Sequence, residues 1–494
     1  MTLLSPQQYR DSLRELHPDV WVRGKRVECV ADEPLLQPGV NAIAFTYELA
    51  LNPELASVML STLPTGEQVS RLVALDMSTD DLLRKLEMCR LLCRSTGCAQ
   101  RYLTHDALGA LAQTTKLIAM ELETDYYDRF HAYLTMVQQR DLTCAVALTD
   151  PKGDRSKRPH QQEDPDLYLH IVERRRDGII VRGAKANITG APYTHEILVL
   201  PTRSMQEADQ DYALSFAVPI DVPGLRIIAK PAGRPGDAEA PFSSRYGQCT
   251  ALVVFQDVFI PWERVFLCGE YKYAGALAEA FANHHRHSCV GCRAGLGDMI
   301  IGGAAALASD NGLPHEHVGH IHTAMADLIR IVEGFYATGV AASVYGRRTV
   351  AGTFEPDPVY ANLGKLLLAQ QVYDLFRLAH EIAGGIVVNA PTPEDVANPE
   401  NAALIAKYLV GRPGVPASQR IEMARFLQDL TASGEAGWYA LISTHGGGSP
   451  EALRLSAVRN YDIAERQQLA RRLVCFAKSE EGCSGCGSCS TCAD

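Results

Sequence analysis

One short segment near the middle of the chain combines imidazole and thiol groups. It runs from Phe281 to Arg293 with the sequence FANHHRHSCVGCR. If this segment is helical, His285, Cys289 and Cys292 lie at positions i, i+4 and i+7, which places their side chains on one face. Thiolates and imidazole bind zinc or an iron–sulfur cluster. The spacing therefore indicates a metal site, and the alternative is a polar helix with incidental cysteines.

A second group of thiols lies at the end of the sequence. Its four cysteines recur at every third residue, at Cys483, Cys486, Cys489 and Cys492. The surrounding Gly and Ser residues have no apolar periodicity, so this segment cannot join a hydrophobic core. Four closely spaced thiols can bind zinc or an iron–sulfur cluster. The segment could therefore bind a metal, deliver a cluster or act in redox chemistry, or it could be a thiol tail without metal. It could also supply a ligand to the main site of a neighbouring subunit.

Composition and charge narrow the class of protein. The formal net charge of −11 argues against nucleic acid or an anionic membrane as the main partner. No basic segment followed by an apolar run opens the sequence, and the apolar stretch from Met299 to Leu307 is too short to span a bilayer. We therefore expect a cytoplasmic protein whose 14 cysteines are reduced. Among them, Cys98 could be a buried core thiol or a ligand.

Three blocks of sequence must position these groups. From Pro6 to Gln139 and from Ala274 to Lys478 the apolar residues recur at helical spacing. From Leu142 to Val265 short β-branched runs alternate with Pro, Gly and Asp clusters, as is typical of strands. We predict an α+β fold with an N-terminal helical domain (1–140), a middle β-domain (141–273), a C-terminal helical bundle (274–480) and a cysteine-rich tail (481–494). This block order is that of the acyl-CoA dehydrogenase fold.

Several stretches resemble the family of 4-hydroxybutyryl-CoA dehydratase and the 4-hydroxyphenylacetate 3-hydroxylases. The resemblance extends from near the first residues to about residue 475 and does not include the tail. The stretches that carry it are TDPKGDR (149–155), VRGAK (181–185), EADQDYA (207–213), DVFIP (257–261) and HGGGSP (445–450). The resemblance implies the acyl-CoA dehydrogenase-like fold, FAD as cofactor and a homotetramer.

The resemblance also implies a [4Fe–4S] cluster. The dehydratase holds its cluster with two cysteines four residues apart on one helix and a histidine and a cysteine seven apart on another. These positions are Cys98, Tyr102, His285 and Cys292 here, so one cysteine ligand is replaced by tyrosine. Conversely, Cys289 stands where the family has a tyrosine. Our hypothesis is that Cys98, His285, Cys289 and Cys292 bind the cluster.

Other positions of the family site have changed more. A lysine of the dehydratase is Arg293 here, which keeps the charge but does not release a proton. Two glutamates fall at Thr250 and Ile442, and neither of these side chains can transfer a proton as a carboxyl group does. The loss of both carboxyl groups argues against an unchanged dehydratase reaction.

The flavin positions are better kept. By resemblance, Lys152, Arg155, Thr189 and Gly190 approach the cofactor from the β-domain. A threonine hydroxyl and backbone N–H groups beside the flavin ring stabilise negative charge on the reduced ring. Gly384 and Gly385 match a stretch that meets the flavin across a subunit interface, although two glycines after a helix are usually only a cap.

These observations predict an FAD-dependent enzyme that acts on a small acyl substrate, such as a CoA thioester, by dehydration, isomerisation or related redox chemistry. The residues expected to carry the chemistry are His285, Arg293, Cys289 and Tyr102. One alternative is a flavin-dependent monooxygenase that uses reduced flavin and oxygen on an aromatic substrate. The other is a non-catalytic metal- or cluster-binding protein whose tail delivers its cargo.

Overall fold

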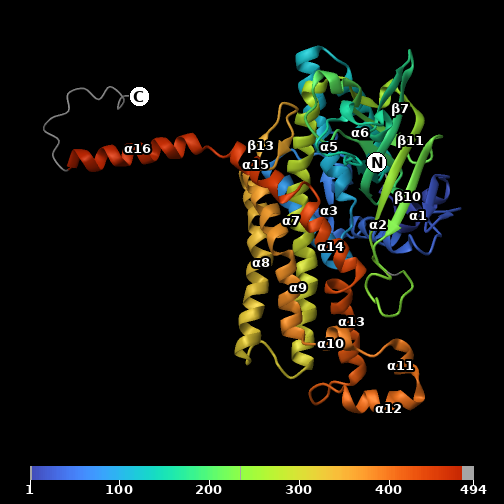
Figure 1. Ribbon diagram of the computed structural model, residues 1–494, viewed down its shortest axis with the longest axis vertical. Coiled ribbons are helices and arrows are strands. Elements are labelled where there is room, and N and C mark those ends of the chain that lie inside the picture. The colour runs from blue at the N-terminus through green and yellow to red at the C-terminus, as the bar shows by residue number, and fades with distance from the viewer. Residues whose placement is uncertain (1–2, 234, 481–494) are drawn as a thin grey trace.

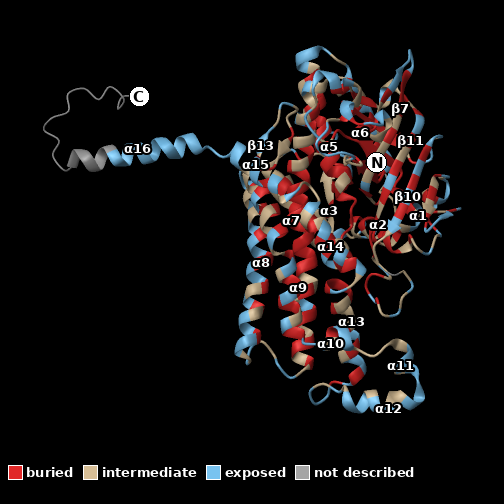
Figure 2. Ribbon diagram, in the orientation of Figure 1, coloured by how far each residue is buried: buried red, intermediate tan, exposed pale blue. Residues whose placement is uncertain are grey.

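A computed structural model describes residues 3–233 and 235–480 of the chain (Figure 1). The four tail cysteines, Cys483 to Cys492, lie outside the described residues. The chain forms a block that contains β-sheets beside a bundle of long helices, with buried residues running through both (Figure 2). The α+β class predicted from the sequence is therefore correct.

The first part of the chain is mainly but not entirely helical. Its helices are α1 (Pro6–Arg14), α2 (Gln37–Ala50), α3 (Ala56–Met59), α4 (Thr79–Thr96), α5 (Tyr102–Leu122) and α6 (Tyr126–Arg140). The expectation of an all-helical segment was wrong in one respect, because it also contains β1 (Asp19–Val22), β2 (Lys25–Arg26), β3 (Leu60–Thr62) and β4 (Gln68–Ser70). Strand β1 pairs in parallel with β10. This pairing joins positions about 200 residues apart, which local periodicity cannot reveal.

The middle of the chain forms two larger sheets. The strands are β5 (Cys144–Ala147), β6 (His170–Arg174), β7 (Gly178–Thr189), β8 (Glu196–Val199), β9 (Leu214–Pro219), β10 (Leu225–Pro231), β11 (Cys249–Pro261) and β12 (Val265–Cys268). One sheet has the order β2-β1-β10-β11-β7-β6 and the other β12-β9-β8-β5. Apolar residues of both sheets share one core with α1 and α2, so the N-terminal helices are part of the packing of the β region.

The last part of the chain is a helical bundle with a short hairpin. Its elements are α7 (Tyr271–Asp310), α8 (Gly319–Val344), β13 (Arg347–Arg348), β14 (Phe354–Glu355), α9 (Pro358–Ala383), α10 (Ile386–Asn389), α11 (Pro393–Ala397), α12 (Pro399–Tyr408), α13 (Ala417–Thr431), α14 (Gly434–His445), α15 (Pro450–Asn460) and α16 (Ile463–Glu480). Helices α7, α8 and α9 lie side by side, whereas α16 projects from the body (Figure 1). Among the described residues only α7 is long and apolar enough to cross a membrane, but 67% of its most apolar window is buried inside the protein.

Helix α7 packs unusually closely against α4 of the first part. A β-carbon added to Gly291 would lie 2.7 Å from the backbone oxygen of Leu86, and one added to Gly295 would lie 2.5 Å from that of Arg90. Glycine at these two positions therefore lets the two backbones touch. This contact brings Cys292 of α7 against Cys93 in the C-terminal half of α4.

Candidate active site

Three thiols meet where α4 ends. The side chains of Cys93 on α4, Cys98 in the following loop and Cys292 on α7 are all buried and lie within hydrogen-bonding reach of one another. Hydrogen bonds from Cys292 and Cys93 lower the pKa of the Cys98 thiol well below its usual value, although burial opposes this. The turn that ends α4 requires Gly97, because φ is +70° there and a β-carbon would collide with the hydroxyl group of Tyr439.

Tyr102 lies between this thiol group and a histidine–cysteine pair. The hydroxyl of Tyr102 is 3.6 Å from the Cys98 sulfur, and its ring stacks on the ring of His285 at a centroid distance of 6.1 Å. On α7, Nε2 of His285 lies 3.5 Å from the sulfur of Cys289. Helix α7 spans the segment from Phe281 to Arg293, so the predicted helical face is confirmed. The structure thus brings Cys98, Tyr102, His285, Cys289 and Cys292 together, and their roles as ligands or catalytic groups stay predictions.

A fully buried carboxylate holds the histidine in place. Asp106 on α5 forms an ion pair with Lys85 at 2.8 Å and accepts a hydrogen bond from Ser288 at 2.7 Å, and it lies 3.3 Å from Nδ1 of His285. Burial disfavours the charged imidazole, but the neighbouring Cys289 and Asp106 outweigh burial and raise the pKa of His285 to about 10. Burial likewise opposes ionisation of Cys289, but His285 outweighs it and lowers the pKa of this thiol. The arrangement favours an imidazolium–thiolate pair.

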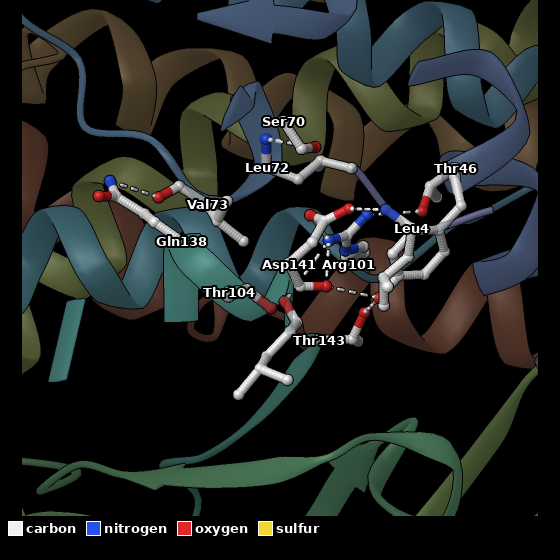
Figure 3. A network of polar contacts seen from close by, with 12 residues as sticks. Leu4, Thr46, Ser70, Leu72, Val73, Arg101, Thr104, Gln138, Asp141 and Thr143 are labelled. Carbon is white, nitrogen blue, oxygen red and sulfur yellow. Dashed lines mark hydrogen bonds and ion pairs between the residues drawn. The ribbon is translucent and has the colours of Figure 1, made fainter. Parts of the chain in front are cut away.

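The start of α5, and with it Tyr102, is anchored by a second buried ion pair (Figure 3). Arg101 is fully buried, donates hydrogen bonds to the carboxylate and backbone oxygen of Asp141, and lies 3.8 Å above the ring of Tyr47. The carboxylate of Asp141 also accepts the backbone N–H of Leu4 at 3.1 Å. Chain segments far apart in sequence therefore converge on Arg101, next to the site residue.

Arg293 places a permanent positive charge beside the thiols. Its guanidinium lies 3.5 Å from the sulfur of Cys292, donates to the hydroxyl of Ser443 at 2.9 Å, and packs over the rings of Trp438 and Tyr439. Because an arginine side chain stays protonated, this group can bind an anion or polarise a carbonyl but cannot serve as a proton donor.

Two of the predicted flavin residues lie near the loop that carries Cys98. Thr189 at the end of β7 pairs with Thr250 of β11, and Gly190 follows with φ of +74°. A β-carbon on Gly190 would collide with the side chain of Gln100. The amide of Gln100 hydrogen-bonds to Gln248, which in turn donates to the backbone oxygen of Cys98 at 2.6 Å. The ends of two central strands therefore meet the loop that carries Cys98.

The other predicted flavin residues lie apart. Lys152 and Arg155 are in the loop after β5, where Lys152 is half-buried and Arg155 is exposed. Gly384 and Gly385 are exposed between α9 and α10, at the end of the bundle away from α5 and α6 (Figure 1). Near them, an open groove of about 820 Å³ runs between α9 and α14, lined by Tyr373, Phe376, Arg377, His380, Ala436 and Leu441 among others. A shared role of these positions in flavin binding stays a prediction.

Some buried groups of the site were missed by the sequence analysis. Cys93 belongs to the group Cys89, Cys93 and Cys98, whose spacing is the signal that could have indicated it. For Asp106 and Glu435 no local signal exists, because a carboxyl group in a helix is usually solvent-exposed. Within residues 3–233 and 235–480, no three His, Cys, Asp or Glu side chains are arranged as ligands of a single metal ion. The Tyr102 side chain instead lies among these groups, with its hydroxyl near the Cys98 sulfur and its ring stacked on that of His285.

Comparison with known proteins shows that this chain is an enzyme, because the relatives that it matches are enzymes. The family models for the N-terminal and C-terminal parts of 4-hydroxyphenylacetate 3-hydroxylase match residues 5–267 and 274–474. The chain belongs to this family, as the sequence motifs predicted. It is 38% identical to the 4-hydroxybutyryl-CoA dehydratase/vinylacetyl-CoA-Delta-isomerase of Clostridium aminobutyricum, over 95% of this chain and 99% of that protein.

Solved structures agree with this assignment. An oxygen-tolerant archaeal 4-hydroxybutyryl-CoA dehydratase from N. maritimus superposes with a TM-score of 0.92 at 37% identity, covering 96% of this chain and 95% of that one. The oxygenase component of 4-hydroxyphenylacetate 3-monooxygenase, complexed with FAD and 4-hydroxyphenylacetate, superposes with a TM-score of 0.87 at 24% identity, covering 97% and 100%. The second similarity shows the shared fold alone.

Proposed function

We propose that this protein is an FAD-dependent enzyme that isomerises or dehydrates a short acyl-CoA thioester. One observation carries the proposal: Cys98, Cys292 and the His285–Cys289 pair converge around Tyr102 at the place where the strands carrying Thr189 and Thr250 end. The 38% identity to a dehydratase and isomerase of 4-hydroxybutyryl-CoA and vinylacetyl-CoA supports the substrate class. Under this proposal the fold is of the acyl-CoA dehydrogenase type.

FAD would be held by Lys152, Arg155, Thr189 and Gly190, with Gly384 and Gly385 contributed by a neighbouring subunit of a cytoplasmic homotetramer. Helix α16 supports an oligomer, because it projects from the body (Figure 1) and its apolar side chains Leu469, Leu473 and Val474 are exposed. When bound, FAD would supply electron transfer, and an iron–sulfur cluster would act as a Lewis acid on a substrate oxygen.

The donor groups suit such a cluster. A histidine that binds metal usually donates its second ring N–H to a carboxylate, and Asp106 lies 3.3 Å from Nδ1 of His285, which leaves Nε2 for a metal. Cys98, Cys289 and Cys292 supply soft thiolates. These four residues would hold the [4Fe–4S] cluster, and the tail cysteines (Cys483, Cys486, Cys489 and Cys492) would hold a second metal or cluster.

The remaining side chains would act on the acyl group. Arg293 would stabilise negative charge on the thioester oxygen. Burial and the surrounding thiols raise the pKa of Tyr102 well above its usual value, so its hydroxyl stays a hydrogen-bond donor. The proton that His285 and Cys289 share in this structure would be released when these two residues bind the cluster, because metal ligands must be deprotonated.

The proposal predicts turnover of a named substrate. We expect anaerobically purified, FAD-loaded protein to convert vinylacetyl-CoA to its conjugated isomer, and protein from which FAD has been removed to be inactive. Product formation is followed by chromatography of the CoA esters. Absence of turnover with both vinylacetyl-CoA and 4-hydroxybutyryl-CoA in holoenzyme that contains flavin would contradict the proposed function.

A monooxygenase is the second candidate. It is favoured by Thr250 and Ile442, which leave two positions without the carboxyl groups that the dehydratase resemblance implies. Consumption of oxygen by the protein with reduced FAD and a phenol, without isomerisation of acyl-CoA, would establish this activity instead.

Removal of one thiol tests the cluster. We expect protein purified anaerobically to contain about four iron atoms per cluster with matching sulfide, and Cys292→Ala to lose the iron and sulfide of one cluster. Cys144→Ala is the matched control, because Cys144 is equally buried but lies on β5 and contacts Tyr133. Equal and negligible iron in the wild type and in Cys292→Ala would exclude a cluster at this site.

A further inference from the structure

Glu435, in the first turn of α14, has a fully buried carboxyl group of which only one oxygen accepts a hydrogen bond. Its Oε2 accepts the backbone N–H of Gln248 at 3.3 Å. Its Oε1 has no hydrogen-bond partner in the part of the chain that the structure describes, and Glu435 forms no ion pair there. Buried polar atoms without a partner are rare in folded proteins, and such an atom indicates a place for a ligand or an ordered water.

A second unpaired polar group lies one turn further along the same helix face. The hydroxyl of Tyr439 is buried and lies within reach of the Glu435 carboxyl group, but it forms no well-aligned hydrogen bond within the described residues. It touches the backbone at Gly97, directly before Cys98. Since residues four apart share one face of a helix, Glu435 and Tyr439 line the same side of α14. That side faces the loop between α4 and α5.

Gln248 connects this carboxyl group to the thiol site. Its backbone N–H binds Glu435, and its side-chain amide donates to the backbone oxygen of Cys98 at 2.6 Å. Gln248 lies two residues before Thr250, whose strand partner is Thr189. Glu435 therefore lies next to the predicted flavin residues and next to the loop that carries Cys98.

We propose that Glu435, with Tyr439 beside it, is the acid–base group of the active site and exchanges a proton with the acyl carbons of the substrate. This inference rests on the proposed function and names the residue that would transfer the proton in that reaction. Ile442 follows Glu435 by seven residues and lies on the same face of α14. The family resemblance implies carboxyl groups at positions 250 and 442, which are Thr250 and Ile442 here. Glu435 supplies a carboxyl group to the site from a different position.

Burial suits Glu435 to this role. Removal from water raises the pKa of the carboxyl group to about 8, although the backbone N–H of Gln248 and the hydroxyl of Tyr439 both oppose this. Both its protonated and its charged form are therefore populated near neutral pH. The titratable groups that act electrostatically on it come from several elements, namely Asp429 of α13, Cys98 of the α4–α5 loop, Tyr439 of α14, Tyr193 and Cys249.

In isomerisation of a but-3-enoyl thioester, the charged carboxylate would remove a proton from the carbon next to the thioester carbonyl. The electron pair of that C–H bond forms the new double bond, and the former double bond shifts its pair to the terminal carbon. The carboxylic acid then returns the proton to that terminal carbon. One C–H bond breaks, one forms, and no electron is gained or lost.

The test is the substitution Glu435→Gln, which keeps the shape and the acceptor for Gln248 but has no proton to exchange. We expect turnover of vinylacetyl-CoA to fall by about 10²–10⁴-fold, with FAD and iron contents unchanged, and Glu435→Asp to recover part of it. Asp310→Asn is the control, because this buried carboxylate accepts a hydrogen bond from Gln419 and lies at the end of α7 far from Cys292. It is expected to stay within about tenfold of wild type. Turnover of Glu435→Gln within about threefold of wild type would overturn the inference.

An infrared measurement separates failure of the inference from failure of the proposed function. We expect the wild-type protein to show the carbonyl stretch of a protonated carboxyl group near neutral pH, and this band to vanish in alkali and in Glu435→Gln. If the wild type does not turn over acyl-CoA, the proposed function fails, and this band alone decides whether Glu435 holds a proton in the site. A spectrum identical in the wild type and in Glu435→Gln would overturn the inference.

Discussion

Asp106→Asn is expected to destabilise the folded protein by about 3–5 kcal/mol, because it removes the carboxylate nearest to the buried ammonium group of Lys85. The Nζ atom of Lys85 is 2.8 Å from Asp106 and 3.8 Å from Asp76, and all three side chains are buried. Asparagine is nearly isosteric with aspartate, so the loss comes from the charge and not from a cavity. The measurement is unfolding by denaturant or heat at one fixed protein concentration, since an oligomer's stability depends on concentration.

The exposed ion pair of Asp80, on the same helix as Lys85, provides a matched control. Asp80→Asn removes an ion pair with Arg84 at 2.6 Å, but the side chain of Asp80 is 67% exposed. Exposed pairs contribute little, so we expect a loss below about 1 kcal/mol. Similar losses for Asp106→Asn and Asp80→Asn would show that the buried network does not stabilise the fold. Replacing Lys85 with methionine in Asp106→Asn should recover part of the loss, because the unpaired charge is then removed.

The predictions that succeeded depend on local sequence. The helical spacing of His285, Cys289 and Cys292 predicted a shared face, and α7 spans this segment. The motifs from residues 149 to 450 indicated the family, which the matches over most of the chain confirm. A face of a helix follows from backbone geometry alone, and a family follows from ordered motifs, so neither requires knowledge of long-range packing.

The parts that could not be predicted depend on contacts between distant segments. Asp106 is an active-site neighbour only because α4 and α5 both pack against α7, which brings Lys85 and His285 to it. Cys93 joins Cys98 and Cys292 because Gly291 and Gly295 let α7 approach α4. Strand β1 joins the large sheet by pairing with β10. The local periodicity of apolar residues carries no information about contacts between distant segments.

The pH dependence of stability provides a further test of Glu435. In the folded protein its pKa is raised to about 8 from the usual 4.5, chiefly by burial. Between these two values the folded state binds a proton that the unfolded state has released. The stability contributed by this proton is therefore fully present below about pH 4.5 and is lost as the pH rises to about 8, at up to about 1.4 kcal/mol per pH unit.

Glu435→Gln carries no charge at any pH in this interval, so this dependence should vanish in the variant. Relative to the wild type, we expect Glu435→Gln to gain about 4 kcal/mol of stability between pH 5 and pH 8. Glu435→Asp keeps a titratable carboxyl group in the same surroundings and should retain most of the wild-type dependence. The measurement is denaturant unfolding of the three proteins at several pH values and one protein concentration. Parallel curves for the wild type and Glu435→Gln would show that the carboxyl group is already charged when the protein is folded, because a group with the same charge in both states has no linkage to folding.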